Sequence, residues 1–484
     1  MRGAATLCTL GTVLLSLFHA INAIRIGDTG SPKVVRFDLQ RREISNPIES
    51  DRLRKRSKKV VKTKLINDLS IYMCEVRLGN PPQKLTLYVD TGSSDLWTNA
   101  ANTTFHGELA GYKPKRAYNP GASSTAALLS SDFRIRYTDG SSANGDYFTD
   151  MLRIENVKLP NFQFGLGYTS NSREGVMGIG YPENEIQVSR NKKHPYPNLP
   201  FALKNAGLIK SASYSIWLNS LYSKRGSLIF GGIDQAKYHG KLQTTSIIPN
   251  RYGIYREIVV SLTEISVGAG KGKGSQHVGG EFPISILLDT GCSLTYLPPR
   301  VTEAIYQEVG AMYNKQWDLS VIPCTQKYQD AKITFKFGTP TAAASITINL
   351  AKLILPMPLK DDGSPIAPAQ SGLCLFGIFP MSDGVKLPTL GATFLRQTYI
   401  FVNLEKNEVG MAVAKSNVWR ENIKEVNNGE GGRPPTEHLM RRHRLATTTS
   451  TTTSLMKAFA MPMARPDMYI GALVGLVGVI FALM

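Results

Sequence analysis

Apolar and polar residues alternate over many short stretches between residues 65 and 414, and Gly, Pro and Asn separate these stretches. The clearest examples are segments 76–78, 85–89 and 133–137. This two-residue period predicts short β-strands joined by turns. Helical spacing is rarer, and its candidates are Arg300–Met312 after a Pro-Pro pair and Leu199–Ala206 before Gly207. We therefore expect a mainly β fold.

The chain has 484 residues, 42% of them hydrophobic, which predicts two domains or one large bilobal unit. Its composition changes after residue 414. Segment 427–435 is rich in Gly, Pro and Asn and indicates a linker. Segment 446–454 is nearly all Thr and Ser, which is typical of an O-glycosylated stalk. We assign residues 416–454 to this linker and stalk.

Both ends of the chain carry apolar segments. Residues 10–18 follow Arg2 and precede small residues, which predicts a secretory signal peptide over residues 1–23; a buried N-terminal strand is the alternative. Residues 468–484 are apolar with no basic residue after them. This favours a GPI-attachment signal over residues 455–484, with Ser454 or a neighbour as the attachment site, and a single membrane span is the alternative. The expected location is the plasma membrane or cell wall.

The formal net charge is +19, and its distribution argues against a nucleic-acid partner. Residues 24–64 carry 13 basic and 5 acidic side chains, and residues 415–467 carry 9 and 5. With Arg2 also set aside, residues 65–414 hold only +6 of the excess.

The basic run Arg54-Lys55-Arg56, followed by Ser57, resembles a site for a kexin- or furin-type processing protease. A solvated basic loop is the alternative. In a secreted chain we favour processing, which predicts a propeptide over residues 24–56 and a mature chain that begins near Ser57.

The tripeptide Asp-Thr-Gly occurs at residues 90–92 and again at 289–291, each time after an apolar segment with strand character. Two Asp-containing turns are the simplest structural explanation. The shared prefix instead indicates a duplicated half-site. Two carboxylates about 3 Å apart do not both ionise readily, so the pair would hold one proton at mildly acidic pH. One partner would act as general base on a water, and the other would polarise a carbonyl and protonate the leaving amine.

The neighbours of the two aspartates suit this chemistry. The glycines allow backbone N–H groups to approach the carboxylates closely. The threonines are placed to bind across the interface of the two loops, and the Ser93 hydroxyl is placed to bond the outer oxygen of Asp90. The candidate supporting residues are Thr91, Gly92, Ser93, Thr290, Gly291 and Cys292, the last in the position that matches Ser93.

The sequence resembles a pepsin-like aspartic protease over nearly all of residues 65–415. DTGSSDLW at residues 90–97 is close to the family's first signature, and YMCEVRLGNPPQ at 72–83 is similar to its first strand and turn. GVMGIGY at 175–181 and LGATF at 390–394 resemble the segments that cross beneath the active-site loops. The resemblance implies a bilobal fold with the active-site cleft between two pseudo-symmetric lobes, about 65–212 and 213–415.

The same resemblance implies an aspartic endopeptidase that cleaves protein or peptide substrates with Asp90 and Asp289, as a monomer and without cofactor or metal. It implies that Tyr137 is the flap tyrosine that closes over substrate. It also implies a disulfide between Cys324 and Cys374. Residues 57–415 are accordingly assigned to the peptidase domain, and Asn102 is the predicted N-glycosylation site within Asn-Thr-Thr.

With the predicted propeptide, stalk and tail, the chain is most similar to the fungal yapsin-like, GPI-anchored members of this family, which tend to cleave at basic residues. Asp139 in the flap fits that preference, because a carboxylate there would pair with a substrate Lys or Arg. A plain turn residue beside Gly140 is the alternative.

The chain also departs from the family. Cys292 stands where a Ser or Thr is usual, and a thiol is a weaker hydrogen-bond donor. Cys74 and Cys292 have no family partner, so they either pair with each other or both stay reduced. The competing function is a catalytically silent binding or cell-wall protein on the same fold. A glycosidase also uses two carboxylates, but that chemistry does not account for the repeated motif.

Overall fold

The computed structural model describes residues 24, 33–44, 65–66, 69–137, 140–190, 192–269, 274–339, 342–360, 365–368, 371–382 and 387–427. The predicted signal peptide, processing site, Thr/Ser-rich stalk and C-terminal tail lie outside the described residues, as does Asp139. In the described part of the chain, no helix is long and apolar enough to cross a membrane.

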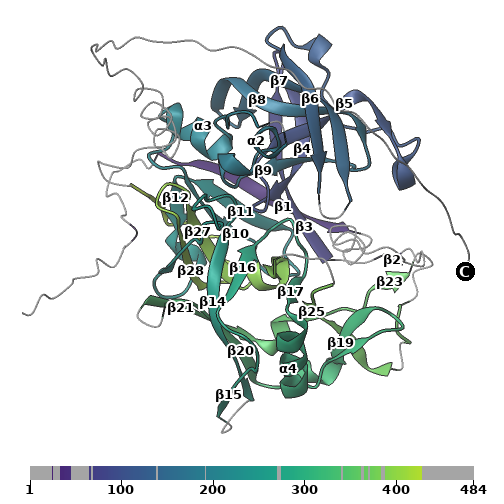
Figure 1. Ribbon diagram of the computed structural model, residues 1–484, viewed down its shortest axis with the longest axis vertical. Coiled ribbons are helices and arrows are strands. Elements are labelled where there is room, and N and C mark those ends of the chain that lie inside the picture. Colours follow the sequence, from purple (N-terminus) through teal and green to yellow (C-terminus); the bar gives the residue numbers. More distant parts are fainter. Residues whose placement is uncertain are drawn as a thin grey trace, which may run out of the picture. The chain divides into compact units, whose positions relative to one another are not determined.

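The described chain is built mainly from β-sheets, as the alternating pattern predicts (Figure 1). The largest sheet has thirteen strands in the order β13 (Gln243–Ser246), β28 (Glu408–Val413), β27 (Thr398–Asn403), β10 (Ser213–Trp217), β11 (Arg225–Phe230), β1 (Val35–Ile44), β3 (Leu69–Leu78), β4 (Gln83–Asp90), β9 (Gly175–Gly178), β5 (Leu96–Phe105), β8 (Val157–Ser170), β7 (Ser142–Ile154) and β6 (Ala127–Arg136). The predicted strand segments 76–78 and 85–89 lie in β3 and β4, and segment 133–137 lies in β6 except for Tyr137, which follows it.

A second sheet holds β21 (Ala342–Asn349), β20 (Ala331–Thr339), β14 (Val259–Ala269), β16 (Ile284–Leu288), β26 (Thr389–Leu390), β17 (Thr295–Leu297) and β25 (Ile378–Pro380), with β15 (Ser275–His277) paired to β14. A smaller sheet comprises β18 (Met312–Asn314), β19 (Leu319–Pro323), β24 (Leu373–Phe376) and β22 (Ile354–Leu355). Two further pairs are β12 (Gly232–Asp234) with β29 (Ile423–Glu425), and β2 (Leu65–Ile66) with β23 (Leu359–Lys360).

Helices are short and few among the described residues: α2 (Ile186–Ser189), α3 (Leu199–Asn205), α4 (Pro299–Val309) and α5 (Ala392–Leu395). Both predicted helices are confirmed as α3 and α4. The predicted helix over 300–312 ends earlier than expected, because Gly310 adopts φ +69° and closes the last turn of α4.

The two halves of the chain repeat one strand arrangement. β9 pairs parallel to β4 and antiparallel to β5, so it lies between the strands on either side of the first Asp-Thr-Gly motif. β26 pairs parallel to β16 and antiparallel to β17 in the same way around the second motif. This repetition is the pseudo-symmetry expected of two matching lobes.

Each crossing strand requires a glycine. A Cβ on Gly178 would lie 2.5 Å from the Ser94 backbone nitrogen, and a Cβ on Gly391 would lie 2.1 Å from the Leu294 carbonyl oxygen. No side chain fits at either position, so the two Gly-containing segments can pass directly beneath the motif-bearing loops.

The thirteen-stranded sheet reaches beyond the predicted peptidase domain at its N-terminal side. β1 lies in the predicted propeptide, yet it pairs with β11 on one side and β3 on the other (Figure 1, purple). Val35, Phe37 and Leu39 point alternately into the core and are at most 4% exposed. This segment is therefore an internal strand of the folded chain.

The folded chain also reaches beyond the predicted boundary at residue 415. β29 pairs with β12, and the Glu425 and Val426 side chains are buried. The change of composition after residue 414 suggested a linker from 416 onward. The structure differs because residues 423–425 pair with β12 in a two-stranded sheet and are followed by the buried Val426.

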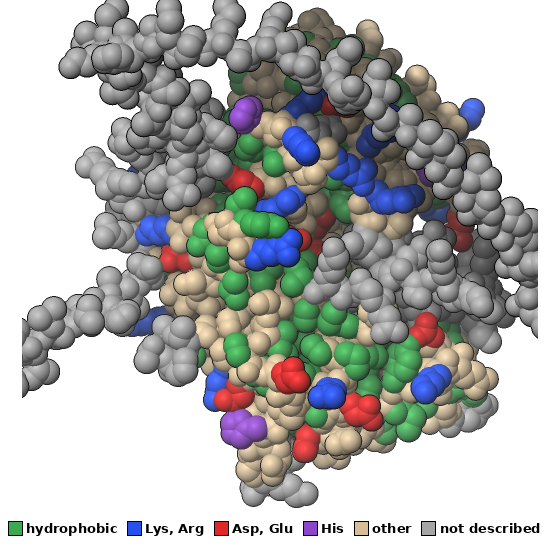
Figure 2. All heavy atoms as spheres, viewed as in Figure 1, with side chains coloured by type: hydrophobic (Ala, Val, Ile, Leu, Met, Phe, Trp, Pro, Cys, Tyr) green, Lys and Arg blue, Asp and Glu red, His purple; other side chains and the backbone are tan. Residues whose placement is uncertain are grey.

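Charged side chains of both signs are mixed on the described surface. Figure 2 shows acidic and basic side chains beside one another in the lower half of this face, over α4, β15 and β20. A continuous basic patch is not seen there, in keeping with the modest charge of residues 65–414.

Candidate active site

Each Asp-Thr-Gly motif begins where a buried central strand ends. β4 places Leu85, Leu87 and Val89 in the core and ends at Asp90. β16 ends at Leu288, immediately before Asp289. The apolar prefix is thus the inward face of a central strand, which delivers each aspartate at a fixed position. The Asp90 side chain is itself only 5% exposed.

The two motif threonines join the two loops. The Thr91 backbone N–H donates to Thr290 Oγ1 over 3.1 Å, and the Thr290 N–H donates to Thr91 Oγ1 over 3.0 Å. Each hydroxyl then donates to a carbonyl of the opposite strand: Thr91 to Leu288 over 2.8 Å and Thr290 to Val89 over 2.9 Å. These four buried hydrogen bonds hold the loops in one relative orientation.

This arrangement brings the two carboxylates to one place. A Cβ on Gly92 would lie 2.9 Å from Asp289 Cγ and 3.0 Å from each of its oxygens, so the Asp289 carboxylate rests against the first loop. The Gly92 N–H donates to Asp90 Oδ1 and the Gly291 N–H donates to Asp289 Oδ1, both over 2.8 Å. The carboxylates are therefore oriented symmetrically by backbone donors.

The residue beside the outer side of the pair differs between the two loops. The Ser93 hydroxyl donates to Asp90 Oδ2 over 2.6 Å, at the place that the sequence predicts. The matching residue, Cys292, is 3% exposed, and its backbone N–H donates to the Asp289 carbonyl over 3.3 Å. It packs with Leu294, Tyr296 and other apolar side chains. The second loop thus has a thiol in an apolar setting where the first has a hydroxyl.

The β6–β7 hairpin carries the predicted flap tyrosine. Tyr137 directly follows β6, and its N–H donates to the Ser141 carbonyl over 2.8 Å. Its hydroxyl accepts a hydrogen bond from Trp97 Nε1 over 2.8 Å. Burial, with a contribution from the nearby Asp90, raises the pKa of Tyr137, so its hydroxyl stays protonated. Trp97 lies in the quoted DTGSSDLW segment, but sequence reasoning gave it no role.

Sequence reasoning also missed a buried polar cluster behind the first loop. Asp95 Oδ1 accepts from the hydroxyls of Tyr147 and Tyr196 over 3.2 and 3.1 Å, and Asp95 Oδ2 accepts from the Ile186 N–H over 2.9 Å. The Tyr196 N–H donates to Glu185 Oε2 over 2.9 Å. The only available signal was a charged residue immediately before the apolar Leu96-Trp97 pair.

The cysteines divide into a disulfide and two buried thiols. Cys324 and Cys374 form the disulfide that the resemblance implies. Cys74 and Cys292 are outside any disulfide. Of the two alternatives that the sequence left open, a mutual disulfide or two reduced thiols, the structure has the reduced thiols. Cys74 Sγ lies 3.7 Å from Met177 Sδ, and burial raises the pKa of its thiol.

Other candidate features are remote from this chemistry. Asn102 lies on β5 with an exposed side chain, so it is sterically accessible to glycosylation. Among the described residues, no group of His, Cys, Asp and Glu side chains is arranged to hold a metal.

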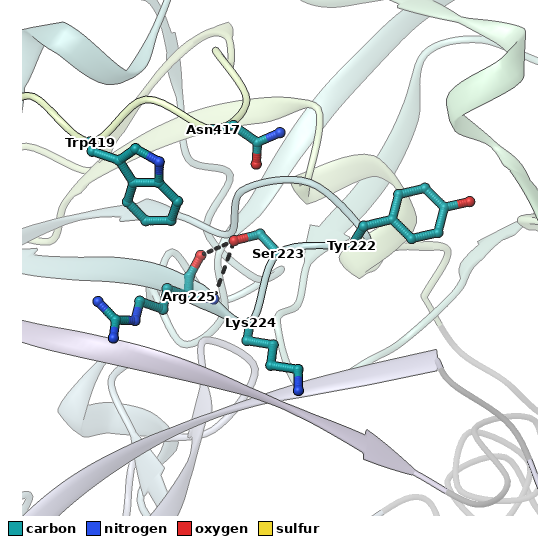
Figure 3. Close-up of a pocket in the computed structure, with 6 residues that line it drawn as sticks. All are labelled: Tyr222, Ser223, Lys224, Arg225, Asn417 and Trp419. Atoms are coloured by element: carbon teal, nitrogen blue, oxygen red, sulfur yellow. Dashed lines mark hydrogen bonds between the residues drawn. The ribbon is translucent and has the colours of Figure 1, made fainter.

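A surface pocket of about 430 Å³ is lined by Tyr222, Ser223, Lys224, Arg225, Asn417 and Trp419 (Figure 3). These residues come from the loop before β11, from β11 itself and from the segment before β29. The Ser223 hydroxyl is occupied by hydrogen bonds with the Arg225 backbone. The lining contains no carboxylate, so this pocket is separate from the two aspartates.

Comparison with known proteins agrees with this geometry. The family model described as eukaryotic aspartyl protease matches residues 71–414. The chain is 40% identical over 406 residues to a probable aspartic-type endopeptidase, opsB, from Aspergillus oryzae, covering 83% of this chain and 80% of that protein. It is 30% identical over 388 residues to the aspartic proteinase yapsin-3 of Saccharomyces cerevisiae, covering 78% and 73%.

Among solved structures, an aspartic proteinase from Irpex lacteus aligns with a TM-score of 0.56 at 20% identity, covering 73% of this chain and 97% of that one. This likeness supports the pepsin-like fold. The family match and the relatives above 30% identity extend across both motif-bearing halves. The chain therefore belongs to the eukaryotic aspartyl protease family and is an aspartic-type endopeptidase.

Proposed function

We propose that Asp90 and Asp289 are the catalytic residues and hydrolyse peptide bonds by activating a water between them at acidic pH. The observation that carries this proposal is the position of the Asp289 carboxylate against Gly92, within the threonine-linked pair of loops. The mechanism assigns one proton to the pair, so that one carboxylate is ionised and the other protonated. The pair then supplies both a base and an acid without a covalent intermediate.

In this mechanism the ionised carboxylate removes a proton from water as the water attacks the scissile carbonyl. The protonated carboxyl donates to the carbonyl oxygen and stabilises the charge that develops there. Collapse of the tetrahedral intermediate transfers a proton to the leaving amine and restores the starting state. The Gly92 and Gly291 N–H groups and the Ser93 hydroxyl hold the carboxylate oxygens in place throughout.

The test is hydrolysis of a peptide library at pH 4–6 by the processed chain, with and without a statine-type inhibitor. Asp90→Asn and Asp289→Asn should each lower kcat by at least about 10²–10⁴-fold. Asp132→Asn is the matched control, because Asp132 is a partly exposed carboxylate in an ion pair with Lys193. Absence of cleavage by correctly processed wild-type chain would favour a silent binding protein. Hydrolysis of glycans that survived Asp90→Asn would favour a glycosidase.

We also propose that Asp139 gives a preference for basic residues at the cleavage site. Support comes from the position of Asp139 two residues after Tyr137 and from the similarity to a yeast yapsin. A carboxylate at the flap would form a charge-assisted hydrogen bond with a substrate Lys or Arg. Library profiling of Asp139→Ala against wild type tests this; an unchanged preference for basic residues would remove Asp139 from the explanation.

The maturation and location proposals follow from the sequence. A kexin-type protease would cut after Arg56, and Arg56→Ala should then yield a chain that keeps residues 24–56 by mass spectrometry. A GPI anchor in place of the C-terminal tail would hold a monomeric enzyme at the cell surface. Release by phosphatidylinositol-specific phospholipase C supports the anchor, whereas retention in the membrane fraction supports a membrane span.

A further inference from the structure

We propose that Asp95 and Glu185 form a proton-holding pair that positions the flap and sets the upper pH limit of activity. Both are positioning residues, since neither belongs to the Asp-Thr-Gly motifs. The proposal goes beyond the catalytic roles of Asp90 and Asp289 and depends on them only for its activity readout.

The pair is deeply buried. The side chains of Asp95 and Glu185 are 1% and 0% exposed. They are joined through Tyr196, whose hydroxyl donates to Asp95 Oδ1 and whose backbone N–H donates to Glu185 Oε2. The residue after Glu185 completes the link, because the Ile186 N–H donates to Asp95 Oδ2.

The hydrogen bonds in this cluster can stabilise one ionised carboxylate but not two. Asp95 accepts three hydrogen bonds, whereas Glu185 accepts one and its Oε1 is buried without a hydrogen-bond partner. A buried carboxylate oxygen without a donor is costly when ionised, and a protonated carboxyl avoids that cost. The geometry therefore favours an ionised Asp95 beside a neutral Glu185.

No cation offsets a second charge. In the described part of the chain, neither Asp95 nor Glu185 is hydrogen-bonded or ion-paired to Lys, Arg or His. The titratable groups that bear on the pair from neighbouring elements are Tyr147, Tyr196, Tyr137, Glu183 and, through Tyr147, Asp132. All of these are neutral or acidic. Burial raises the pKa of Asp95 to about 6, and burial together with the nearby Asp95 raises the pKa of Glu185 well above its usual value.

The cluster is built into the flap. Tyr147 belongs to β7, the return strand of the flap hairpin, and it packs edge-on against Phe133 of β6 and against Tyr196. Asp95 lies two residues before Trp97, which donates to the flap residue Tyr137. Asp95 thus ties the hairpin through Tyr147 to the start of β5, and Trp97 ties Tyr137, the residue after β6, to the same strand.

Ionisation of Glu185 as well as Asp95 would place two buried negative charges beside the flap hairpin. The available relief is a movement of residues 182–190 and of the flap base that admits water. Substrate closure would weaken, so KM should rise as pH increases through the range in which the second carboxyl, Glu185, ionises, while the acid limb stays in place. Below that range the pair keeps a proton and the flap is held.

The experiment compares kcat and KM from pH 3 to 8 for wild type, Glu185→Gln and the control Glu183→Gln. Glu183 is also buried and lies two residues away; burial raises its pKa, and Arg256 partly opposes that effect. Glu185→Gln should move the alkaline limb of kcat/KM upward by about one pH unit, mainly through KM, and leave the acid limb unchanged. An unmoved alkaline limb, or an equal movement in Glu183→Gln, overturns the proposal.

A second measurement keeps the proposal testable if peptide cleavage fails. Thermal unfolding of Asp90→Asn and of Asp90→Asn/Glu185→Gln is followed between pH 4 and 8. The Tm of the single variant should fall steeply as pH rises, and the double variant should show a flatter profile. Parallel profiles, offset by a constant, would mean that Glu185 is only a structural residue and would refute the proton-holding role.

Discussion

Thr91 and Thr290 each donate a backbone N–H to the other's hydroxyl, although they are 199 residues apart in the chain. Neither loop therefore completes its own hydrogen bonding. The shape of each half of the candidate active site depends on the other half, and a change at one threonine exposes polar groups on both sides.

Thr290→Ala should destabilise the chain and lower activity. It removes the acceptor of the Thr91 N–H and the donor to the Val89 carbonyl, and a buried polar group left unpaired costs about 1–3 kcal/mol. Urea unfolding measures the loss, and Thr290→Ser is the control that keeps the hydroxyl. Equal stability of the Ala and Ser variants would show that the cross-loop bonds are not a source of stability.

Trp97→Phe should weaken substrate binding more than it slows the chemical step. The variant keeps an aromatic ring and removes the indole N–H that donates to Tyr137. A net hydrogen-bond contribution of about 0.5–1.5 kcal/mol corresponds to a KM increase of about 2- to 12-fold. A double-mutant cycle with Tyr137→Phe measures the coupling, and strictly additive effects would argue against this bond in the substrate-bound enzyme.

Loss of the disulfide should lower the free energy of unfolding. Cys324 and Cys374 close a loop with a sequence separation of 50, for which the chain-entropy model gives about 4 kcal/mol. The variant Cys324→Ser/Cys374→Ser is compared with wild type by urea unfolding, with and without reductant. Wild type in reductant should approach the variant, and a variant as stable as oxidised wild type would contradict the prediction.

Asp150→Asn should destabilise the chain at neutral pH and have less effect in acid. Burial acts to raise the pKa of Asp150, but hydrogen bonds from Thr125 and Tyr118 outweigh it and hold the pKa below the usual value of 3.8. A lowered folded-state pKa stabilises the protein above the unfolded-state pKa, and this stability is lost as pH falls through the folded-state value. Tm should therefore differ between variant and wild type at pH 6 and converge toward pH 2–3. A constant difference across that range would contradict the assignment.

The fold was largely predictable because its signals are local. Alternation placed the strands, and Gly207 marked the end of α3, whereas the same role of Gly310 at the end of α4 was overlooked. The meeting of the two motifs was inferred from repetition and not from any local pattern. The reciprocal hydrogen bonds between Thr91 and Thr290 show that the two loops meet.

The hydrogen-bond partners of Asp95 were less predictable, because they are distant in the sequence and belong to residue types that are common on protein surfaces. Glu185 and Tyr196 resemble surface residues in the sequence, and only their burial beside Asp95 shows a role. β1 was not predicted as a strand of the folded chain because the basic run after it indicates a processing site, which places β1 in a propeptide. β29 was missed because three residues are too short for a periodic signal.

The position of β1 has a consequence for how the chain folds. Val35 pairs with Phe230, and Ser213 of the same sheet pairs with Asn403, so central contacts join residues that are synthesised far apart in time. Such nonlocal pairing makes folding slow and leaves strand edges exposed while the partners are missing. If residues 24–56 are cut away after folding, the unfolded mature chain lacks a strand with which it first assembled. Its durability would then be governed by the rate of unfolding and not by an equilibrium.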